Sequence, residues 1–347
     1  MVGSLGLGCD RDRVSLTVLQ VGLAPPPNYH ADVNKLSPQS TAVSTLTRRL
    51  FALNVVAQCA IVVTGALVRL TGSGLGCPTW PDCAEGSLIP VQRQAEGFHK
   101  YIEFGNRLLT FVLAVVIIAS IIAAIRHKPR RTPLVILSAS LLLGVVAQAV
   151  LGGITVLTGL NPYSVAAHFL VSIVMIALAT TLYERGRERG DAKPTILVQP
   201  LLANVARLLV VVGLLVVVIG TVVTGSGPHS GDAASLVRFG LEPRAISWLH
   251  ADVVIAFLGL TFALLIGLTV TSAPRRAIRA VQVLLVLIVL QGALGFTQYF
   301  LGVPELLVAL HVAGACAIWW ATLRIWFAMR TRLVAADLLS VEEHRST

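Results

Sequence analysis

The sequence predicts an all-α membrane protein, with eight transmembrane helices arranged as two pseudo-symmetric four-helix bundles. The 347 residues are 55% hydrophobic and 13% charged, and the mean hydropathy is +0.81. Soluble domains carry about 25% charged residues, so this composition excludes a disordered chain and an ordinary water-soluble domain. Two further observations support the class: the apolar residues form eight long runs, and motifs of the first half recur in the second.

The eight runs are long enough to cross a bilayer as helices. A hydrocarbon core of about 30 Å requires roughly 20 apolar residues in a helix. The runs are too long for strands and do not alternate, which argues against a β-barrel. The predicted spans are Leu50–Leu70, Glu103–Ile125, Pro133–Leu157, Tyr163–Tyr183, Leu201–Thr224, Ala245–Thr271, Val281–Phe300 and Pro304–Met329.

These spans predict the domain organisation. The first 45 residues differ from the rest and indicate a disordered tail, or a start assigned too far upstream, so that they are not translated. The expected segments are a cytoplasmic tail over 1–47, one four-helix bundle over 48–184, a cytoplasmic linker over 185–200, a second bundle over 201–330 and a cytoplasmic tail over 331–347.

The basic residues predict the orientation. A formal net charge of +10 arises from 27 Lys and Arg against 17 Asp and Glu, and 21 of those 27 fall in the tails, in the loops after spans two, four and six, or close to them. Cytoplasmic loops of membrane proteins carry such an excess, so both termini are expected in the cytoplasm. The charge is therefore a topology signal, and we expect no nucleic-acid partner.

The second half repeats the first. The motif Gln148-Ala-Val-Leu-Gly152, followed by Val165-Ala-Ala-His168, recurs 143 residues later as Gln291-Gly-Ala-Leu-Gly295, followed by Val308-Ala-Leu-His311. Thr71-Gly-Ser-Gly74 also recurs after span five. Four spans per repeat keep the halves in the same orientation, related by an axis along the membrane normal.

Three of the eight histidines are expected at one depth in the membrane. His168, His250 and His311 each lie within about seven residues of the outer ends of spans four, six and eight. Ionisable groups are costly there, so they usually face a bundle interior or a cofactor. No cluster of Cys or carboxylates accompanies them, which disfavours a zinc site with three or four protein ligands. Haem needs only one or two axial imidazoles, so these residues predict ligation of haem iron.

The repeat also predicts a fourth histidine on span two, but another residue stands there. Moving His250 back by 143 or 144 residues leads to Arg107 or Asn106. His99 lies seven residues before Asn106 on nearly the same helical face, about 10 Å further out. Whether Asn106 or His99 contributes to a haem site therefore stays open.

These residues together resemble the haem A synthase family of bacteria, membrane proteins that convert haem O to haem A. The resemblance covers about residues 48–330. Span one runs into Gly65-Ala-Leu-Val-Arg-Leu-Thr-Gly-Ser-Gly-Leu-Gly-Cys-Pro-Thr-Trp-Pro-Asp-Cys83, which is similar to the family's first-span signature. Span two carries Glu103-Phe-Gly-Asn-Arg107 where the family shows Glu-x-x-His-Arg, and the remaining histidines follow in order.

The resemblance implies different roles for the two halves. His250 and His311 would ligate a permanent haem b, and His168 would ligate the substrate haem O in the first half. Glu103 would lie near the methyl group that is oxidised to a formyl group, where it would assist proton transfer or stabilise a cationic centre. Arg107 would pair with Glu103 or with a haem propionate. Asn106 departs from the pattern, which favours an exchangeable substrate or, alternatively, indicates a crippled first site.

Two cysteines lie in the first outer loop. Cys77 and Cys83 are six residues apart, and the outer side of a bacterial membrane is oxidising, so a disulfide is plausible. Many bacterial members of the family carry such a pair, and a transient redox role is the alternative. The absence of a Cys-x-x-Cys-His motif in the sequence excludes attachment of a c-type haem.

The sequence therefore predicts a multi-pass protein of the bacterial plasma membrane that makes haem A for terminal oxidase assembly. Besides haem O and membrane lipid, the partners expected are a haem O synthase and a quinone or other electron carrier, and homo-oligomers stay open. A b-type membrane cytochrome that carries electrons from quinol shares the histidine pair and is the main alternative. A transporter is a third, although the mid-span regions are nearly free of charge.

Overall fold

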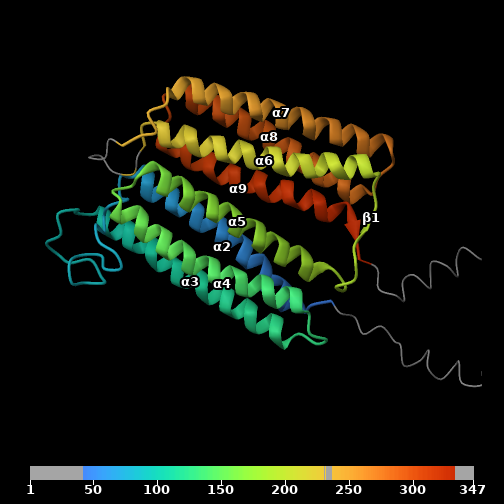
Figure 1. Cartoon of the computed structure of the whole chain (residues 1–347), viewed down its shortest axis with the longest axis horizontal. Coiled ribbons are helices and arrows are strands. Elements are labelled where there is room, and N and C mark those ends of the chain that lie inside the picture. Colours follow the sequence, from blue (N-terminus) through green and yellow to red (C-terminus); the bar gives the residue numbers. More distant parts are fainter. Residues whose placement is uncertain (1–41, 230, 232–236, 333–347) are drawn as a thin grey trace, which may run out of the picture. The chain divides into compact units, whose positions relative to one another are not determined.

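Eight long helices make up most of the part of the chain that the structure describes. This structure is a computed structural model, and it describes residues 42–229, 231 and 237–332. The helices are α2 (Thr45–Leu70), α3 (His99–Arg126), α4 (Thr132–Leu157), α5 (Pro162–Arg187), α6 (Pro200–Ser226), α7 (Pro243–Val270), α8 (Arg275–Phe300) and α9 (Glu305–Ala328). Each is long and apolar enough to cross a membrane, which confirms the eight predicted spans. The helices lie side by side in Figure 1.

The helices begin earlier than hydropathy predicts where charged residues precede the apolar run. Helix α2 begins at Thr45 rather than Leu50, and α8 begins at Arg275 rather than Val281. Long basic side chains keep their charges in water while their stems cover apolar surface, so a helix continues beyond the hydrocarbon region. Most of the predicted tails over 1–47 and 331–347 lies outside the described residues, as do His30 and His344.

Each half of the chain forms a ring of four helices. In the first half, consecutive helices pack together from α2 to α5, and α5 closes the ring against α2. Helices α6 to α9 repeat this arrangement. Helices α3 and α5 therefore face each other diagonally across one ring, and α7 and α9 do so across the other. Each ring has its own apolar core, and a third cluster, which includes Val62, Ile176 and Trp319, joins the two.

Two turns show the repeat in the backbone. The turn from α4 to α5 has positive φ at Gly159 (62°) and Leu160 (58°), and the turn from α8 to α9 has it at Gly302 (75°) and Val303 (61°). The two pairs are 143 residues apart, as in the sequence repeat. Successive left-handed residues are costly for a side chain such as leucine or valine. Their presence in both turns shows that the two hairpins have the same geometry.

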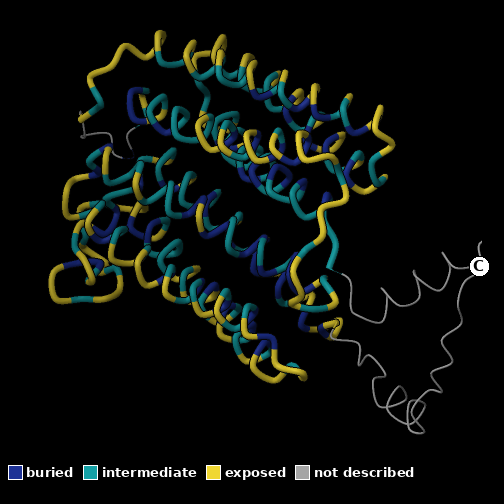
Figure 2. Tube along the Cα trace, turned by 45° about the vertical axis from the view of Figure 1, so that its right-hand side comes forward, coloured by how far each residue is buried: buried dark blue, intermediate teal, exposed yellow. Residues whose placement is uncertain are grey.

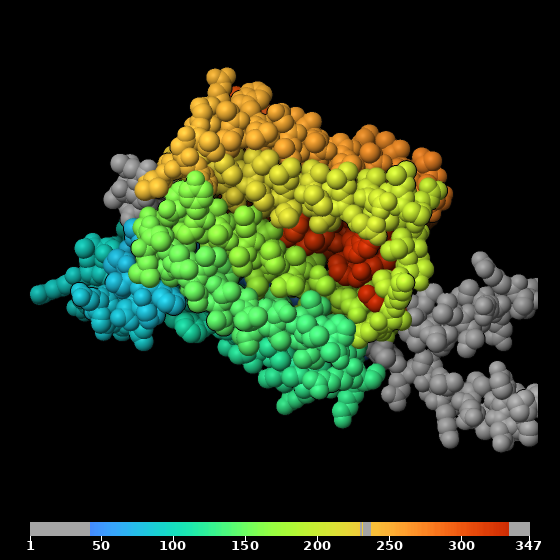
Figure 3. Space-filling model, in the orientation of Figure 1, coloured from blue at the N-terminus to red at the C-terminus, as the bar shows by residue number. Residues whose placement is uncertain are grey.

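Helix α9 contacts helices of both halves. It packs against α2 and α5 as well as against α6 and α8, and Trp319 Nε1 donates a hydrogen bond of 3.0 Å to the carbonyl oxygen of Ile173 on α5. Figure 3 shows a red strip of α9 between the green surface of the first half and the yellow surface of α6, and Figure 2 shows buried segments along the inner helices. A donor such as Trp Nε1 requires an acceptor when buried, so this bond fixes how the halves meet.

The two ends of the helices differ, and we name them by their residues. The disulfide end carries the loop between α2 and α3 with Cys77 and Cys83. The arginine end carries Arg131, Arg185, Arg330 and Arg332. At that end β1 (Thr195–Ile196) pairs antiparallel with β2 (Arg330–Thr331), with Thr195 opposite Thr331. The predicted linker over 185–200 therefore contains a short strand, which hydropathy does not indicate.

Candidate functional site

Each of the three predicted ligand histidines lies against a glycine of the neighbouring helix. His168 on α5 faces Gly152 on α4, and His311 on α9 faces Gly295 on α8 in the equivalent place. A Cβ atom at these glycines would lie 3.4 Å and 3.2 Å from Cε1 of the facing ring. His250 on α7 faces Gly220 on α6 in the same way, at 3.3 Å. The three imidazoles are therefore confined on one side, where a side chain in place of the glycine would be in close contact with them.

The same histidines each have one buried ring nitrogen on the side of the neighbouring helix. Nδ1 of His168, His250 and His311 is buried in each case and makes no hydrogen bond of standard geometry to a described residue. Each Nδ1 lies on the side of the imidazole that faces the glycine, 3.7–3.8 Å from a Cβ atom built there. Nε2 is therefore the nitrogen left to bind a metal centre. The arrangement is thus compatible with the haem that the sequence implies.

A glutamine fixes the backbone of two of these histidines. Gln148 Nε2 donates a hydrogen bond of 3.1 Å to the carbonyl oxygen of His168, and Gln291 Nε2 donates one of 2.7 Å to that of His311. The two glutamines are 143 residues apart and were visible in the sequence only as markers of the repeat. Their bonds hold the helix backbone at the candidate ligands and thereby orient the side chains.

The two rings differ at the position diagonal to the last histidine. In the second ring His250 lies on α7, the helix diagonal to α9, which carries His311. In the first ring the corresponding helix α3 carries Asn106, whose Nδ2 lies 4.0 Å from a Cβ built on Gly65 of α2. Its Oδ1 is buried with no hydrogen-bond partner among the described residues. Asn106 thus lies on the helix of the first ring that corresponds to α7, but it approaches Gly65 less closely than His250 approaches Gly220.

His99 lies at the first residue of α3 and is engaged elsewhere. Its Nδ1 is 2.9 Å from Oγ of Ser73, in the loop that follows α2. Among the other loop histidines, His229 has Nε2 2.8 Å from the carbonyl oxygen of Val303, which joins the α6–α7 loop to the start of α9. Both histidines therefore hold loops at the disulfide end.

Cys77 and Cys83 form a disulfide, which confirms the sequence prediction. Both residues are fully buried. The loop that they close is held on α3 by Glu103, whose Oε2 accepts a hydrogen bond of 2.7 Å from the backbone N–H of Cys77. Glu103 itself is only 6% exposed. The carboxylate therefore lies directly beneath the disulfide loop.

Arg107 completes this attachment. Its Nη2 forms an ion pair of 2.7 Å with Glu103 Oε1, one helical turn earlier. The same guanidinium donates to the carbonyl oxygens of Cys77 and Asp82, each at 3.0 Å, and to that of Thr79 at 3.2 Å. The predicted pairing of Glu103 with Arg107 is thus present. The sequence did not indicate that both side chains bind the backbone of the preceding loop.

The loop also reaches the helix that faces His168. The ring of Trp80 lies over Gly153 of α4, where a Cβ atom would come within 2.4 Å of Trp80 Cδ2. The adjacent residue is Gly152, which faces His168. In the second half the residue equivalent to Gly153 is Phe296, which is exposed. Trp80 thus packs on Gly153 and His168 packs on Gly152. The contact of Trp80 with Gly153 is specific to the first half.

Comparisons with known proteins agree with this arrangement. Residues 48–323 match the model of the COX15-CtaA family, described as cytochrome oxidase assembly protein. The match covers most of the chain and both rings of helices. The chain belongs to this family.

Several proteins named heme A synthase are similar to parts of this chain. The chain is 41% identical over 124 residues to the heme A synthase of Geobacillus kaustophilus, and the aligned residues make up 35% of the chain and 37% of the relative. It is 34% identical over 166 residues to that of Listeria monocytogenes, which is 46% of the chain and 52% of the relative. The chain thus spans about half, or less, of the length of the curated relatives it matches. With eight membrane-crossing helices, it is a multi-pass plasma-membrane protein.

Proposed function

We propose that this chain is a haem A synthase, an oxidoreductase that oxidises the methyl group of haem O to the formyl group of haem A for terminal oxidase assembly. The observation that carries the proposal is the asymmetry between two rings of one design. One diagonal pairs His311 with His250, and the other pairs His168 with Asn106 beneath a disulfide loop. The family description and the printed names of the relatives support the same activity.

The second ring is proposed to hold a permanent haem b. His250 and His311 lie on diagonal helices, and Nδ1 of each imidazole faces a glycine of the neighbouring helix, which leaves Nε2 available to bind iron. These features would allow both histidines to act as ligands of a haem iron. Haem b bound there supplies one-electron redox chemistry. His250 and His311 would hold the group, and the apolar core of this helix ring would insulate it from water.

The first ring is proposed to bind the substrate haem O. His168 provides one ligand, while the neutral amide of Asn106 is a much weaker ligand than an imidazole. The substrate is therefore held less firmly than a group with two histidine ligands, as release of a product requires. Glu103 is proposed to accept or deliver a proton at Oε1 or Oε2, and Arg107 keeps this buried carboxylate in position.

We propose that the arginine end faces the cytoplasm, because the basic loops and the described parts next to both termini lie there. The disulfide end would then face the oxidising side, where Cys77 and Cys83 stay paired. The function implies a haem O synthase as donor of substrate and a quinone or another electron carrier as acceptor. Both partners and the oligomeric state are part of the proposal.

The proposal is tested by the haem that the purified protein contains. The full chain is produced with and without a haem O synthase, and the extracted haems are separated by chromatography. We expect haem b in both preparations, with haem O and haem A in addition when the source of haem O is present. Haem b alone in both preparations would instead support a b-type cytochrome. A protein that contains no haem at all would exclude both functions and favour a transporter.

A further inference from the structure

A basic cavity of about 670 Å³ opens at the arginine end, between the end of α5, the start of α8 and the end of α9. Among the described residues, seven arginines line it, together with two carboxylates, those of Glu184 and Glu188. Apolar side chains, among them Val283, Trp320 and Phe327, form the rest of its wall. A basic pocket with an apolar wall at the end of membrane helices suits an anionic group attached to an apolar body.

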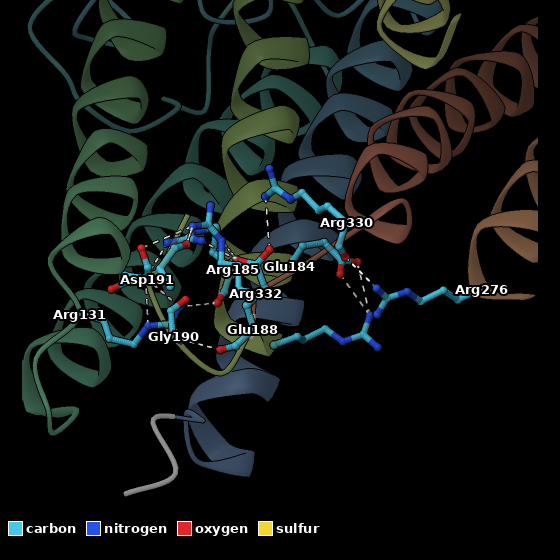
Figure 4. A network of polar contacts seen from close by, with 11 residues as sticks. Arg131, Glu184, Arg185, Glu188, Gly190, Asp191, Arg276, Arg330 and Arg332 are labelled. Carbon is cyan, nitrogen blue, oxygen red and sulfur yellow. Dashed lines mark hydrogen bonds and ion pairs between the residues drawn. The ribbon is translucent and has the colours of Figure 1, made fainter. Parts of the chain in front are cut away.

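The two carboxylates are already shared among several arginines, as Figure 4 shows in part. Glu188 pairs with Arg332 at 2.9 Å and with Arg330 at 3.4 Å. Glu184 pairs with Arg324 at 2.8 Å. Since each carboxylate already serves more than one guanidinium, the wall keeps an excess of positive charge.

Arg330 shows the excess most directly. Its side chain is only 10% exposed, and its Nε atom is buried with no hydrogen-bond partner among the described residues. Burial lowers the pKa of Arg330, and the neighbouring Arg332 and Arg185 lower it further against the opposing effect of Glu188. A second anion at this place would therefore be stabilised by a group that the protein has already desolvated.

Two arginines at the start of α8 have no carboxylate partner in the part of the chain that is described. Arg276 donates to the carbonyl oxygens of Ala328 and Arg330, at 3.1 Å and 2.8 Å, so its charge is not neutralised by these bonds. Arg279 is exposed, and no hydrogen bond or ion pair joins it to a described residue. Both side chains line the cavity.

An apolar track leads from Arg279 along the outer face of α8. Val283, Val286 and Leu290 follow at spacings of four, three and four residues, which places them on the same helical face. Their exposed fractions are 49%, 58% and 62%. Exposed side chains on a membrane-crossing helix lie toward the lipid. The cavity thus continues into a surface on which acyl chains can lie.

We propose that this cavity binds the phosphate headgroup of an anionic phospholipid, with an acyl chain along Val283, Val286 and Leu290. A phosphate diester accepts paired hydrogen bonds from guanidinium groups, which matches arginine better than any other side chain. The apolar track distinguishes a lipid from a soluble phosphate, since only the lipid gains from it. This inference is independent of the proposed function, because none of its residues belongs to either histidine ring.

The experiment compares lipid retention by the full chain and by charge variants. Protein in detergent is mixed with phosphatidylglycerol or phosphatidylcholine, and bound lipid is measured by native mass spectrometry. The test variant is Arg279→Gln, and Arg279→Lys keeps the charge. The matched control is Arg244→Gln, an exposed arginine of the same half at the disulfide end. An arginine near an anionic lipid surface contributes about 1 kcal/mol, which is about a five-fold change in affinity.

We expect the unchanged protein to bind phosphatidylglycerol more tightly than phosphatidylcholine. The affinity for phosphatidylglycerol should fall about five-fold in Arg279→Gln and should not change in Arg244→Gln. The Arg276→Gln and Arg279→Gln double variant should lose more, and Arg279→Lys should retain most of the affinity. Equal binding of the two lipids would overturn the proposal, as would equal losses in the test and control variants. Inorganic phosphate that displaces phosphatidylglycerol at millimolar concentration would also overturn it, because the site would then recognise a soluble anion.

Discussion

Replacing Arg107 by alanine tests whether the Glu103–Arg107 pair holds the disulfide loop on α3. The substitution leaves the Glu103 carboxylate buried without its cation and removes the hydrogen bonds to Cys77, Thr79 and Asp82. Breaking a buried ion pair by removing one partner costs about 3–5 kcal/mol. Arg107 is 22% exposed, so we expect the lower end, about 3 kcal/mol. The cost reflects an uncompensated charge in addition to the lost bonds.

A double-mutant cycle separates these contributions. Glu103→Gln removes the negative charge and keeps an acceptor for Cys77, so its expected cost is about 1–2 kcal/mol. The double variant with Arg107→Ala should cost less than the sum of the single variants, with a coupling of about 1–3 kcal/mol. The measurement is unfolding in mixed sodium dodecyl sulfate micelles, followed by circular dichroism with the disulfide intact.

The control for this cycle is Arg93→Ala, an exposed arginine of the same loop region. We expect it to change the free energy of unfolding by less than about 0.5 kcal/mol, as surface substitutions generally do. The reasoning is refuted if Arg107→Ala is no more destabilising than Arg93→Ala, or if the coupling is below about 0.5 kcal/mol. Activity of the folded Glu103→Gln variant then reports separately on the proposed proton transfer, which the stability measurement does not address.

Three further predictions concern the histidine rings. His250→Ala should abolish the low-spin spectrum of a haem with two histidine ligands, whereas His168→Ala should retain that spectrum. If the purified His168→Ala variant loses the spectrum and His250→Ala keeps it, the roles of the two sites are reversed. Asn106→His should add a second low-spin haem signal and slow the release of product, and unchanged electron paramagnetic resonance spectra would contradict this. A methyl group in Gly295→Ala would lie 3.2 Å from the His311 ring, so we expect a loss of about 1–3 kcal/mol and a perturbed haem spectrum. Gly292→Ala on the same helix, with nothing within 4 Å of the added carbon, should leave the spectrum unchanged.

The helices and their number could be predicted from the sequence because lipid imposes one strong requirement. Every backbone polar group in the hydrocarbon must be paired within its own segment, so a long apolar run is necessarily a helix. The helix ends were less predictable. Arg275 begins α8 six residues before the predicted span, because the helix continues where the hydrocarbon ends. Hydropathy marks the boundary of the solvent rather than the boundary of the helix.

The placement of the candidate ligands could be predicted in part. The 143-residue repeat placed His168 and His311 at equivalent positions, and the structure gives both the same glycine and glutamine neighbours. The contacts of Glu103 with the backbone of Cys77 could not be predicted, since no local pattern encodes a bond over 26 residues. No pattern indicated that Trp80 packs on Gly153. The repeat does show that the two halves differ here, because the position equivalent to Gly153 in the second half is Phe296.

Among the described residues, the differences between the two rings that bear on the candidate ligands lie at the disulfide end of the first one. The two rings share their helix order and their turns, and His168 and His311 make equivalent contacts with a glycine. The duplicated scaffold alone therefore does not distinguish a permanent cofactor from a substrate. The first ring differs in Asn106, in the buried Glu103 and in the disulfide loop attached through Arg107. A weaker ligand lowers the affinity for the bound haem, and a loop fixed above the carboxylate limits the access of water to it. Both changes favour an exchangeable group that undergoes chemistry. Restoring histidine at residue 106 alone should therefore alter ligation without producing a second permanent site, because the loop and Glu103 would remain.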